Sequence, residues 1–200
     1  MRKNFLPIIL SAGLIYLSSC KKDSSDVNNT ARFNGNYKFI SLTAATVNDQ
    51  TFNDGSTIDR IVSKVDYTTK NNQGTLTIND KQMISQGLSY SIDTVGTMTM
   101  YEDGVLLGTE PEDFIIDFPP NDATTDYTWV TSDSATFSNG GTVFLSGGTT
   151  PTGTVGMKFR LDGNTLYMSG AHHQTVTQSQ AGVAISSKIS LSFTAIYQKQ

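Results

Sequence analysis

Apolar and polar residues alternate with a period of two along most of the chain, which is the pattern of half-buried β-strands. The clearest case is the last segment, where one face is apolar: Ile189, Leu191, Phe193, Ala195 and Tyr197. Residues 155–161 alternate in the same way. No apolar period of 3.6 residues follows the first twenty residues, so the pattern predicts no long helix.

The same alternation predicts further strands, separated by turn residues. They cover 36–46, 61–68, 75–78, 88–93, 97–101, 114–118, 127–131, 135–138, 142–145 and 165–169. Turns are predicted at 53–56, 71–74, 103–104, 139–141 and 162–164, where Asn, Asp and Gly gather. Residues 108–113, 147–153 and 174–182 are predicted to be loops. Pro119-Pro120 is predicted to end a strand, because proline cannot donate to a ladder.

Short connections between consecutive strands favour a meander. Eight to ten antiparallel strands joined in this way predict an all-β domain with a single antiparallel β-barrel. A two-sheet β-sandwich is the alternative that the same pattern allows.

The first twenty residues differ from everything that follows. Arg2 and Lys3 precede an apolar run over 5–17, an arrangement typical of an export signal. As a helix, thirteen residues would span roughly 20 Å, whereas a hydrocarbon core is about 30 Å thick. The run is therefore too short to predict a transmembrane helix.

Leu17-Ser18-Ser19-Cys20 closes this run, and Cys20 is the only cysteine of the chain. The four residues resemble the lipobox of bacterial lipoproteins. That resemblance implies cleavage after Ser19, diacylglycerol and N-acyl groups such as palmitate on Cys20, and a stable lipid anchor in the cell envelope, at the outer membrane. An ordinary secretory signal and a permanent amino-terminal anchor are the alternatives.

This prediction divides the chain into a signal peptide (1–19), an acylated cysteine with a flexible tether (20–32) and a folded domain (33–200). The tether is polar and lacks aromatic residues, so it cannot repay the entropy of ordering. Cys20-Lys21-Lys22-Asp23 resembles the start of many lipoproteins of the Bacteroidota, some of which are surface-exposed. Whether the domain faces the periplasm or the surface stays open.

Composition narrows the possible partners. Removal of Arg2 and Lys3 lowers the basic count from 14 to 12 against 18 acidic residues, a net charge of about −6. Nucleic acids and anionic lipid surfaces favour clustered Lys and Arg, so neither is an expected partner. With Cys20 lipidated the domain has no thiol for a disulfide, and packing alone must hold it.

Three segments are similar to lipocalins and to lipocalin-like lipoproteins of the Bacteroidota. They are the strand start at 35–38, the turn at 162–166 and the closing strand at 193–199. The resemblance covers about residues 33–199 and implies a barrel with room for one small apolar ligand. Tyr37 stands where lipocalins usually have Trp, and no second lipocalin motif is evident.

Aromatic residues are the candidates for lining such a cavity. The predicted lining residues are Tyr37, Phe39, Tyr67, Trp129 and Phe159. A barrel of about eight strands can be filled by its inward side chains or hold one small ligand, so a core role is the alternative. Trp129, in a loop-flanked strand, is the residue expected at a mouth.

Candidate metal and catalytic residues are few. Adjacent residues of a strand point to opposite faces, so His172 and His173 cannot easily bind one metal. The acidic run 110–113 matches no calcium-loop spacing, and a polar rim loop is expected there. No Gly-x-Ser-x-Gly motif or phosphate loop occurs. The sequence therefore predicts no catalytic residue, no metal site and no cofactor.

Three functions follow as hypotheses. The first is a non-catalytic, lipid-anchored protein that binds a small hydrophobic ligand inside the barrel. The second is a structural or protein-interaction lipoprotein with a filled barrel. The third, an envelope enzyme, would require polar residues that converge in a cavity.

Overall fold

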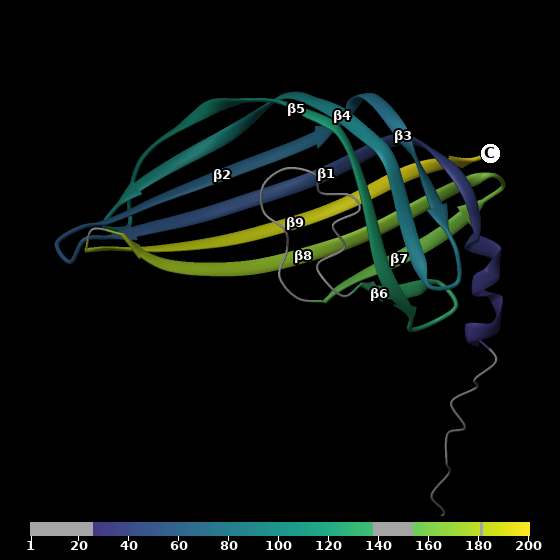
Figure 1. Ribbon diagram of the computed structural model, residues 1–200. Helices are drawn as coiled ribbons and strands as arrows, with labels where there is room; N and C mark the ends of the chain where they lie inside the picture. Colours follow the sequence, from purple (N-terminus) through teal and green to yellow (C-terminus); the bar gives the residue numbers. More distant parts are fainter. Residues whose placement is uncertain (1–25, 138–153, 181) are drawn as a thin grey trace, which may run out of the picture.

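The computed structural model describes residues 26–137, 154–180 and 182–200. The predicted signal peptide, Cys20, the strand 142–145 and the segments 139–141 and 147–153 lie outside them. One short 3₁₀ helix precedes a sheet of nine antiparallel strands (Figure 1). Their bounds are η1 Asp26–Phe33, β1 Gly35–Asn53, β2 Ile58–Thr68, β3 Lys70–Ile78, β4 Gln82–Glu102, β5 Val105–Trp129, β6 Ser134–Phe137, β7 Val155–Asp162, β8 Thr165–Gln180 and β9 Val183–Lys199.

The sheet closes in a ring because its first and last strands pair. Strands follow one another in chain order from β3 to β9, and β1 lies between β3 and β9. The β1–β9 register runs from Tyr37↔Lys199 to Asn53↔Ala184, with one irregularity between Phe39 and Ser41. The all-β, antiparallel meander barrel expected from the alternation is confirmed, and the strands do not divide into the two sheets of a sandwich.

Strands β2 and β3 act as one bent strand beside β1. β2 pairs with β1 residues 43–53 and β3 with 35–38. At the bend, the Leu42 amide donates to the Thr69 Oγ1 atom over 2.9 Å. The hairpin turn predicted at 71–74 is therefore wrong. Asn71 (φ 54°) and Gly74 (φ 107°) instead mark irregularities in the β3–β4 ladder, because such residues tolerate positive φ.

Strands β4 and β5 are longer than the alternation predicts. β4 continues through 94–96, so 88–93 and 97–101 are one strand. β5 includes the predicted loop 108–113 and passes through Pro119-Pro120, and both of those predictions are wrong. The β4–β5 ladder steps from Tyr90↔Phe118 to Leu88↔Asn121, so the two prolines fall at an irregularity where no regular partner is needed.

Strand β8 also extends beyond its predicted end. Residues 174–180 pair regularly with β9, from Gln174↔Ile189 to Gln180↔Val183. The polar loop predicted over 174–182 is therefore wrong in this part. A strand whose side chains are mostly exposed need not alternate in polarity, which explains why the pattern missed it.

Three predicted turns are confirmed. Asp103 and Gly104, with φ of 48° and 80°, join β4 to β5, and Gly163, with φ of 56°, lies between β7 and β8. Between β1 and β2, one Asp54 carboxylate oxygen accepts hydrogen bonds from the Ser56 and Thr57 amides. These bonds lower the pKa of Asp54 to about 2, the Thr57 amide contributing most.

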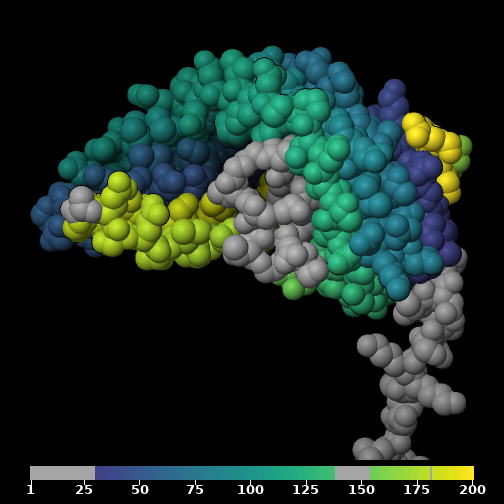
Figure 2. Space-filling view, in the orientation of Figure 1, coloured from purple at the N-terminus to yellow at the C-terminus, as the bar shows by residue number. Residues whose placement is uncertain are grey.

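The ring has a closed end and an open arm. At the closed end β6 and β7 complete the circle, β6 pairing with β5 only at 127–129 and with β7 at 155–158. Beyond these short strands, the described residues form a six-stranded arm in the order β5, β4, β2, β1, β9, β8. Figures 1 and 2 show this arm tapering away from the closed end, with teal strands above and yellow-green strands below.

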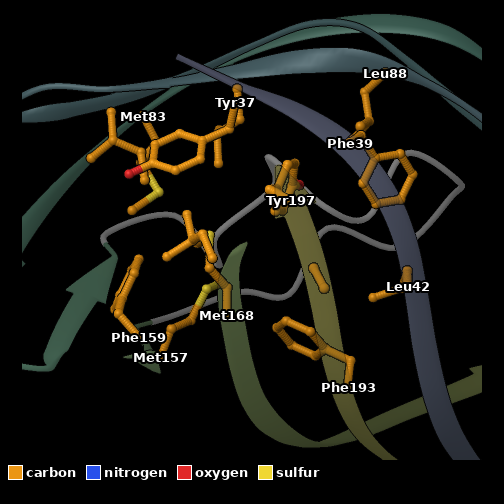
Figure 3. Packing of buried hydrophobic residues seen from close by; sticks show 14 of the residues in the cluster. Tyr37, Phe39, Leu42, Met83, Leu88, Met157, Phe159, Met168, Phe193 and Tyr197 are labelled. Atoms are coloured by element: carbon orange, nitrogen blue, oxygen red, sulfur yellow. The ribbon is translucent and has the colours of Figure 1, made fainter. Parts of the chain in front are cut away.

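The hydrophobic core fills the closed end. Inward side chains from β1, β3, β4, β6, β7, β8 and β9 meet there, and Tyr37, Leu76, Phe137, Leu166, Met168 and Tyr197 have no exposed surface. Figure 3 shows that Tyr37, Met168 and Phe159 converge from different strands. The inward face predicted for 189–197 is confirmed, since Phe193, Ala195 and Tyr197 belong to this core.

Gly96 allows β2 to approach β4 closely. A Cβ atom at this position would lie 2.7 Å from the Lys64 carbonyl oxygen and 2.7 Å from the Val65 Cγ2 atom. Backbone atoms cannot give way as a flexible side chain can, so the β2–β4 ladder requires glycine here.

We predict that Gly96→Ala lowers the free energy of unfolding by about 1–3 kcal/mol, the usual cost of overpacking. Gly108→Ala is the matched control, because a Cβ atom at Gly108, on the neighbouring strand, meets nothing within 4 Å. Its effect should stay within about 0.5 kcal/mol. Urea unfolding followed by Trp129 fluorescence measures both, and equal effects would contradict the role of Gly96.

Candidate functional site

The closed end is sealed by aromatic rings. Phe33, the last residue of η1, is fully buried and stacks on Trp129 at a centroid distance of 5.3 Å. Trp129 in turn packs on Phe159 at 5.0 Å and edge-on against Tyr127 at 5.4 Å. The Tyr37 hydroxyl donates to the Phe33 carbonyl over 2.7 Å and fixes η1 to the barrel. Residues 26–32, which the sequence analysis assigned to the tether, thus belong to η1 and lead directly to Phe33, which covers the closed end.

The five predicted lining residues do not surround one cavity. Tyr37, Phe39 and Phe159 are buried core residues. Tyr67 and Trp129 are half-buried, and each packs on another ring, Tyr67 on Phe114 at 6.2 Å. The structure brings Trp129 and Phe159 together at the closed end and leaves Tyr67 in the arm. Phe33, which the sequence analysis did not single out, covers the position expected for a mouth.

Burial controls the ionisation of four tyrosines. Loss of solvation is the main cause that raises the pKa of Tyr197, and the nearby Tyr90 raises it further. Burial also raises the pKa of Tyr37 and of Tyr67. For Tyr127 burial is again the main cause, opposed by its hydrogen bond with Trp129. These phenols are therefore stabilised in their neutral form.

The inner face of the arm is half-buried and mixed in polarity. Strand register places Ile189, Asn48, Ser63 and Met98 in one row across four strands, and all four are partly exposed. The Asn48 carboxamide oxygen accepts a hydrogen bond from the Ser187 hydroxyl over 2.9 Å. This face can contact an amphipathic molecule but offers no purely apolar lining.

The acidic run and the histidine pair lie on opposite margins of the arm. Residues 110–113 belong to β5 and form no rim loop, so that expectation is wrong. Within the run, Glu112 is half-buried and Asp113 exposed. His173 is also in a strand, and one ring nitrogen lies 2.9 Å from the Ser190 hydroxyl. Among the described residues, no three His, Cys, Asp or Glu side chains are grouped so that they could hold a metal.

Among the depressions that the described residues line, three open mainly on the outer face of the ring. The first, of about 720 Å³, lies over β6, β7, β8 and β9 around Gly156, and the second, of about 530 Å³, lies beside it. Both are lined by Lys158 and Ser169. The third, of about 590 Å³, adjoins them at Ser192 and Thr194 and reaches β1 and β2. We call the three together the outer groove.

A row of hydroxyl side chains runs along this outer groove. Strand pairing connects neighbouring positions in register: Ser134↔Lys158, Lys158↔Ser169, Ser169↔Thr194, Thr194↔Thr43 and Thr43↔Thr68. At its end the Thr43 and Thr68 hydroxyls lie 3.1 Å apart. Five of these six outward side chains carry a hydroxyl. We call these six residues the hydroxyl row.

Small residues beside the hydroxyl row make the outer groove deeper at its centre. Gly156 pairs with Thr136, and Ala171 and Ala45 both pair with Ser192. A Cβ atom added at Gly156 would meet nothing within 4 Å. The groove is therefore hollow because its central positions lack side-chain volume.

Charges of opposite sign occupy the two ends of the outer groove. Arg32, Lys158 and Arg160 line one end together with Asp133, whereas Asp66 and Asp93 line the other. Within the described part of the chain, Lys158 forms no ion pair. The outer groove therefore offers a basic end within an acidic protein.

No family profile matches the chain, and no curated protein matches it in sequence. None of the described helical residues forms a helix long and apolar enough to cross a membrane.

We predict that stability falls as the pH rises above about 10, the ordinary pKa of an unfolded tyrosine. A phenol whose pKa is raised on folding contributes stability below that pH and loses it as the pH rises toward its folded value. Urea unfolding at pH 8, 10 and 11 measures the loss. Tyr197→Phe should flatten the alkaline fall, and an unchanged slope in this variant would contradict the burial argument.

Proposed function

We propose that the protein is a non-catalytic binding protein of the cell envelope, and that its ligand lies in the outer groove. The observation that carries this proposal is the contrast between the two sides of the ring. The side chains expected to line an inner cavity pack against one another. Depressions of about 530–720 Å³, lined by described residues, lie on the outer face, and ligand pockets commonly occupy roughly 300–1,000 Å³.

The anchor belongs to the same proposal. Cys20, after Leu17-Ser18-Ser19, would carry the acyl chains and hold the domain at the outer membrane. Among the described residues, Phe33 is the first along the chain that is fully buried. About a dozen residues therefore separate Cys20 from Phe33, and those from Asp26 onward belong to η1. This arrangement would hold the closed end near the bilayer.

A second candidate is an amphipathic ligand on the inner face of the arm. Its support is the row of partly exposed apolar and polar residues that includes Ile189 and Met98. Such a ligand would lie inside the ring, closer to the small hydrophobic ligand expected from the sequence. The two candidates use opposite faces of the same strands, so one variant on each face separates them.

We predict that Gly156→Leu removes the natural ligand, because a leucine side chain fills open space in the outer groove without meeting the core. The matched inner-face variant is Ile189→Thr, which keeps a β-branched residue in the strand. Native mass spectrometry of the full protein, extracted mildly from its source cells, measures bound small molecules.

Ligand retained by Ile189→Thr and lost by Gly156→Leu supports the outer groove. The reverse result, or the absence of bound ligand from the unmodified protein, contradicts it. Circular dichroism of both variants checks that the fold is retained.

We predict that Cys20→Ala releases the protein from membranes and abolishes palmitate labelling, because each buried CH₂ of an acyl chain contributes about 0.8 kcal/mol. Ser19→Ala is the control, since it keeps a small residue before the cysteine and should stay anchored. Membrane sedimentation and labelling measure both. A Cys20→Ala protein that still sediments with membranes would contradict the anchor.

A further inference from the structure

The chemistry of the outer groove identifies a class of ligand. We infer that it binds an acidic oligosaccharide across the strands, with its carboxylate or phosphate group at Arg32, Lys158 and Arg160 and its hydroxyls along the hydroxyl row. This inference rests on the proposed function and names the ligand of the same site. Four observations support it.

The first observation is the direction and spacing of the hydroxyl row. Its members lie on adjacent strands, at positions joined by the ladder register from Ser134 to Thr68. Neighbouring strands are about 4.8 Å apart, which is comparable to the length of one sugar ring. Successive sugar units can therefore each meet a hydroxyl that both donates and accepts.

The second observation is how the Arg160 and Arg32 side chains are held at the basic end. The Arg160 guanidinium lies 3.8 Å from the centroid of the Tyr167 ring, and one of its nitrogens lies 3.3 Å from an Asp162 carboxylate oxygen. The Arg32 guanidinium lies 4.6 Å from the centre of the Phe33 ring. Both guanidinium groups rest on aromatic faces, which limits their motion. Each already uses one nitrogen, Arg160 toward Asp162 and Arg32 toward the Ser132 carbonyl oxygen at 3.4 Å, and keeps its other N–H groups for a ligand. A guanidinium edge matches a carboxylate or phosphate bidentately.

The third observation concerns Lys158, which belongs to both the hydroxyl row and the basic end. It is exposed, and no carboxylate among the described residues pairs with it. An ammonium group in this position can meet the acidic group of a ligand whose sugar rings lie over Ser169 and Thr194. Lys158 therefore couples recognition of charge to recognition of hydroxyls.

The fourth observation is the opposite end of the groove. Asp66 and Asp93 line it, and Asp93 is also 2.9 Å from the Lys70 ammonium. Carboxylates accept hydrogen bonds from sugar hydroxyls but repel a second acidic group. The ligand therefore has a defined direction, with its acidic group toward β7 and neutral sugar toward β2.

The test uses purified full-length protein and five probes: a galacturonate trisaccharide, a neutral cellulose trisaccharide, inorganic phosphate, galacturonate and triglutamate. Isothermal titration calorimetry at low salt measures each affinity. We expect the acidic trisaccharide to bind at least about tenfold more tightly than any other probe, since hydrogen bonds to a charged group are stronger than those between neutral groups.

Two variants and two matched controls locate the contacts. Lys158→Met should weaken binding of the acidic trisaccharide about tenfold and leave binding of the neutral one unchanged. Lys64→Met, at an exposed position of β2 that does not line the groove, should change neither affinity. Thr43→Val should weaken both trisaccharides about fivefold. Its control is Thr99→Val, because Thr99 forms an equivalent hydroxyl pair with Thr109 at 3.1 Å outside the groove.

Three results would overturn the inference. Equal affinities for the acidic and neutral trisaccharides would show that charge is not recognised. If phosphate or triglutamate bound as tightly as the acidic trisaccharide, the sugar would not be recognised. Unchanged affinity in Lys158→Met removes the assigned site. If any of these occurs while Gly156→Leu still loses the natural ligand, the outer groove stays the binding site and only its ligand class is wrong.

Discussion

The pairing of β1 with β9 is the constraint on which the rest of the molecule depends. It closes a meander that would otherwise end in two free strands, and it thereby separates an inner face from an outer face. The burial patterns of β1 and β9 follow from that separation. The aromatic core lies on one side of the shared strands and the hydroxyl row on the other, so one ladder positions both.

The alternation of apolar and polar residues was sufficient to predict those strands that have one face in the core and the other in solvent. In β7 and β9 one face enters the core and the other meets solvent, and these strands were predicted with the correct faces. It found residues 114–118 and 127–129 of β5 but missed the rest of that strand and the end of β8, where most side chains are exposed. Prolines and acidic residues also made β5 hard to recognise as a strand. Such residues are nevertheless typical of an edge strand, where they prevent pairing with a further strand.

The outer groove could not be predicted in the same way. Its hydroxyl row joins residues from six strands, and serine and threonine are too common for any one of them to be conspicuous in the sequence. Only the ladder register brings Thr43 beside Thr194. Phe33 was overlooked for a related reason. A single aromatic residue after a polar segment gives no periodic signal, and its role depends on Trp129 and Phe159 far along the chain.

The closing ladder also sets an order of events during folding. Asn48 and Ser187, joined by a side-chain hydrogen bond across β1 and β9, are 139 residues apart in sequence. Pairing so distant requires that all residues from β1 to β9 exist first, and such contacts form slowly. A chain still being synthesised therefore keeps one edge of β1 unpaired and has no enclosed interior. Closure of the ring is therefore the last step in forming the sheet.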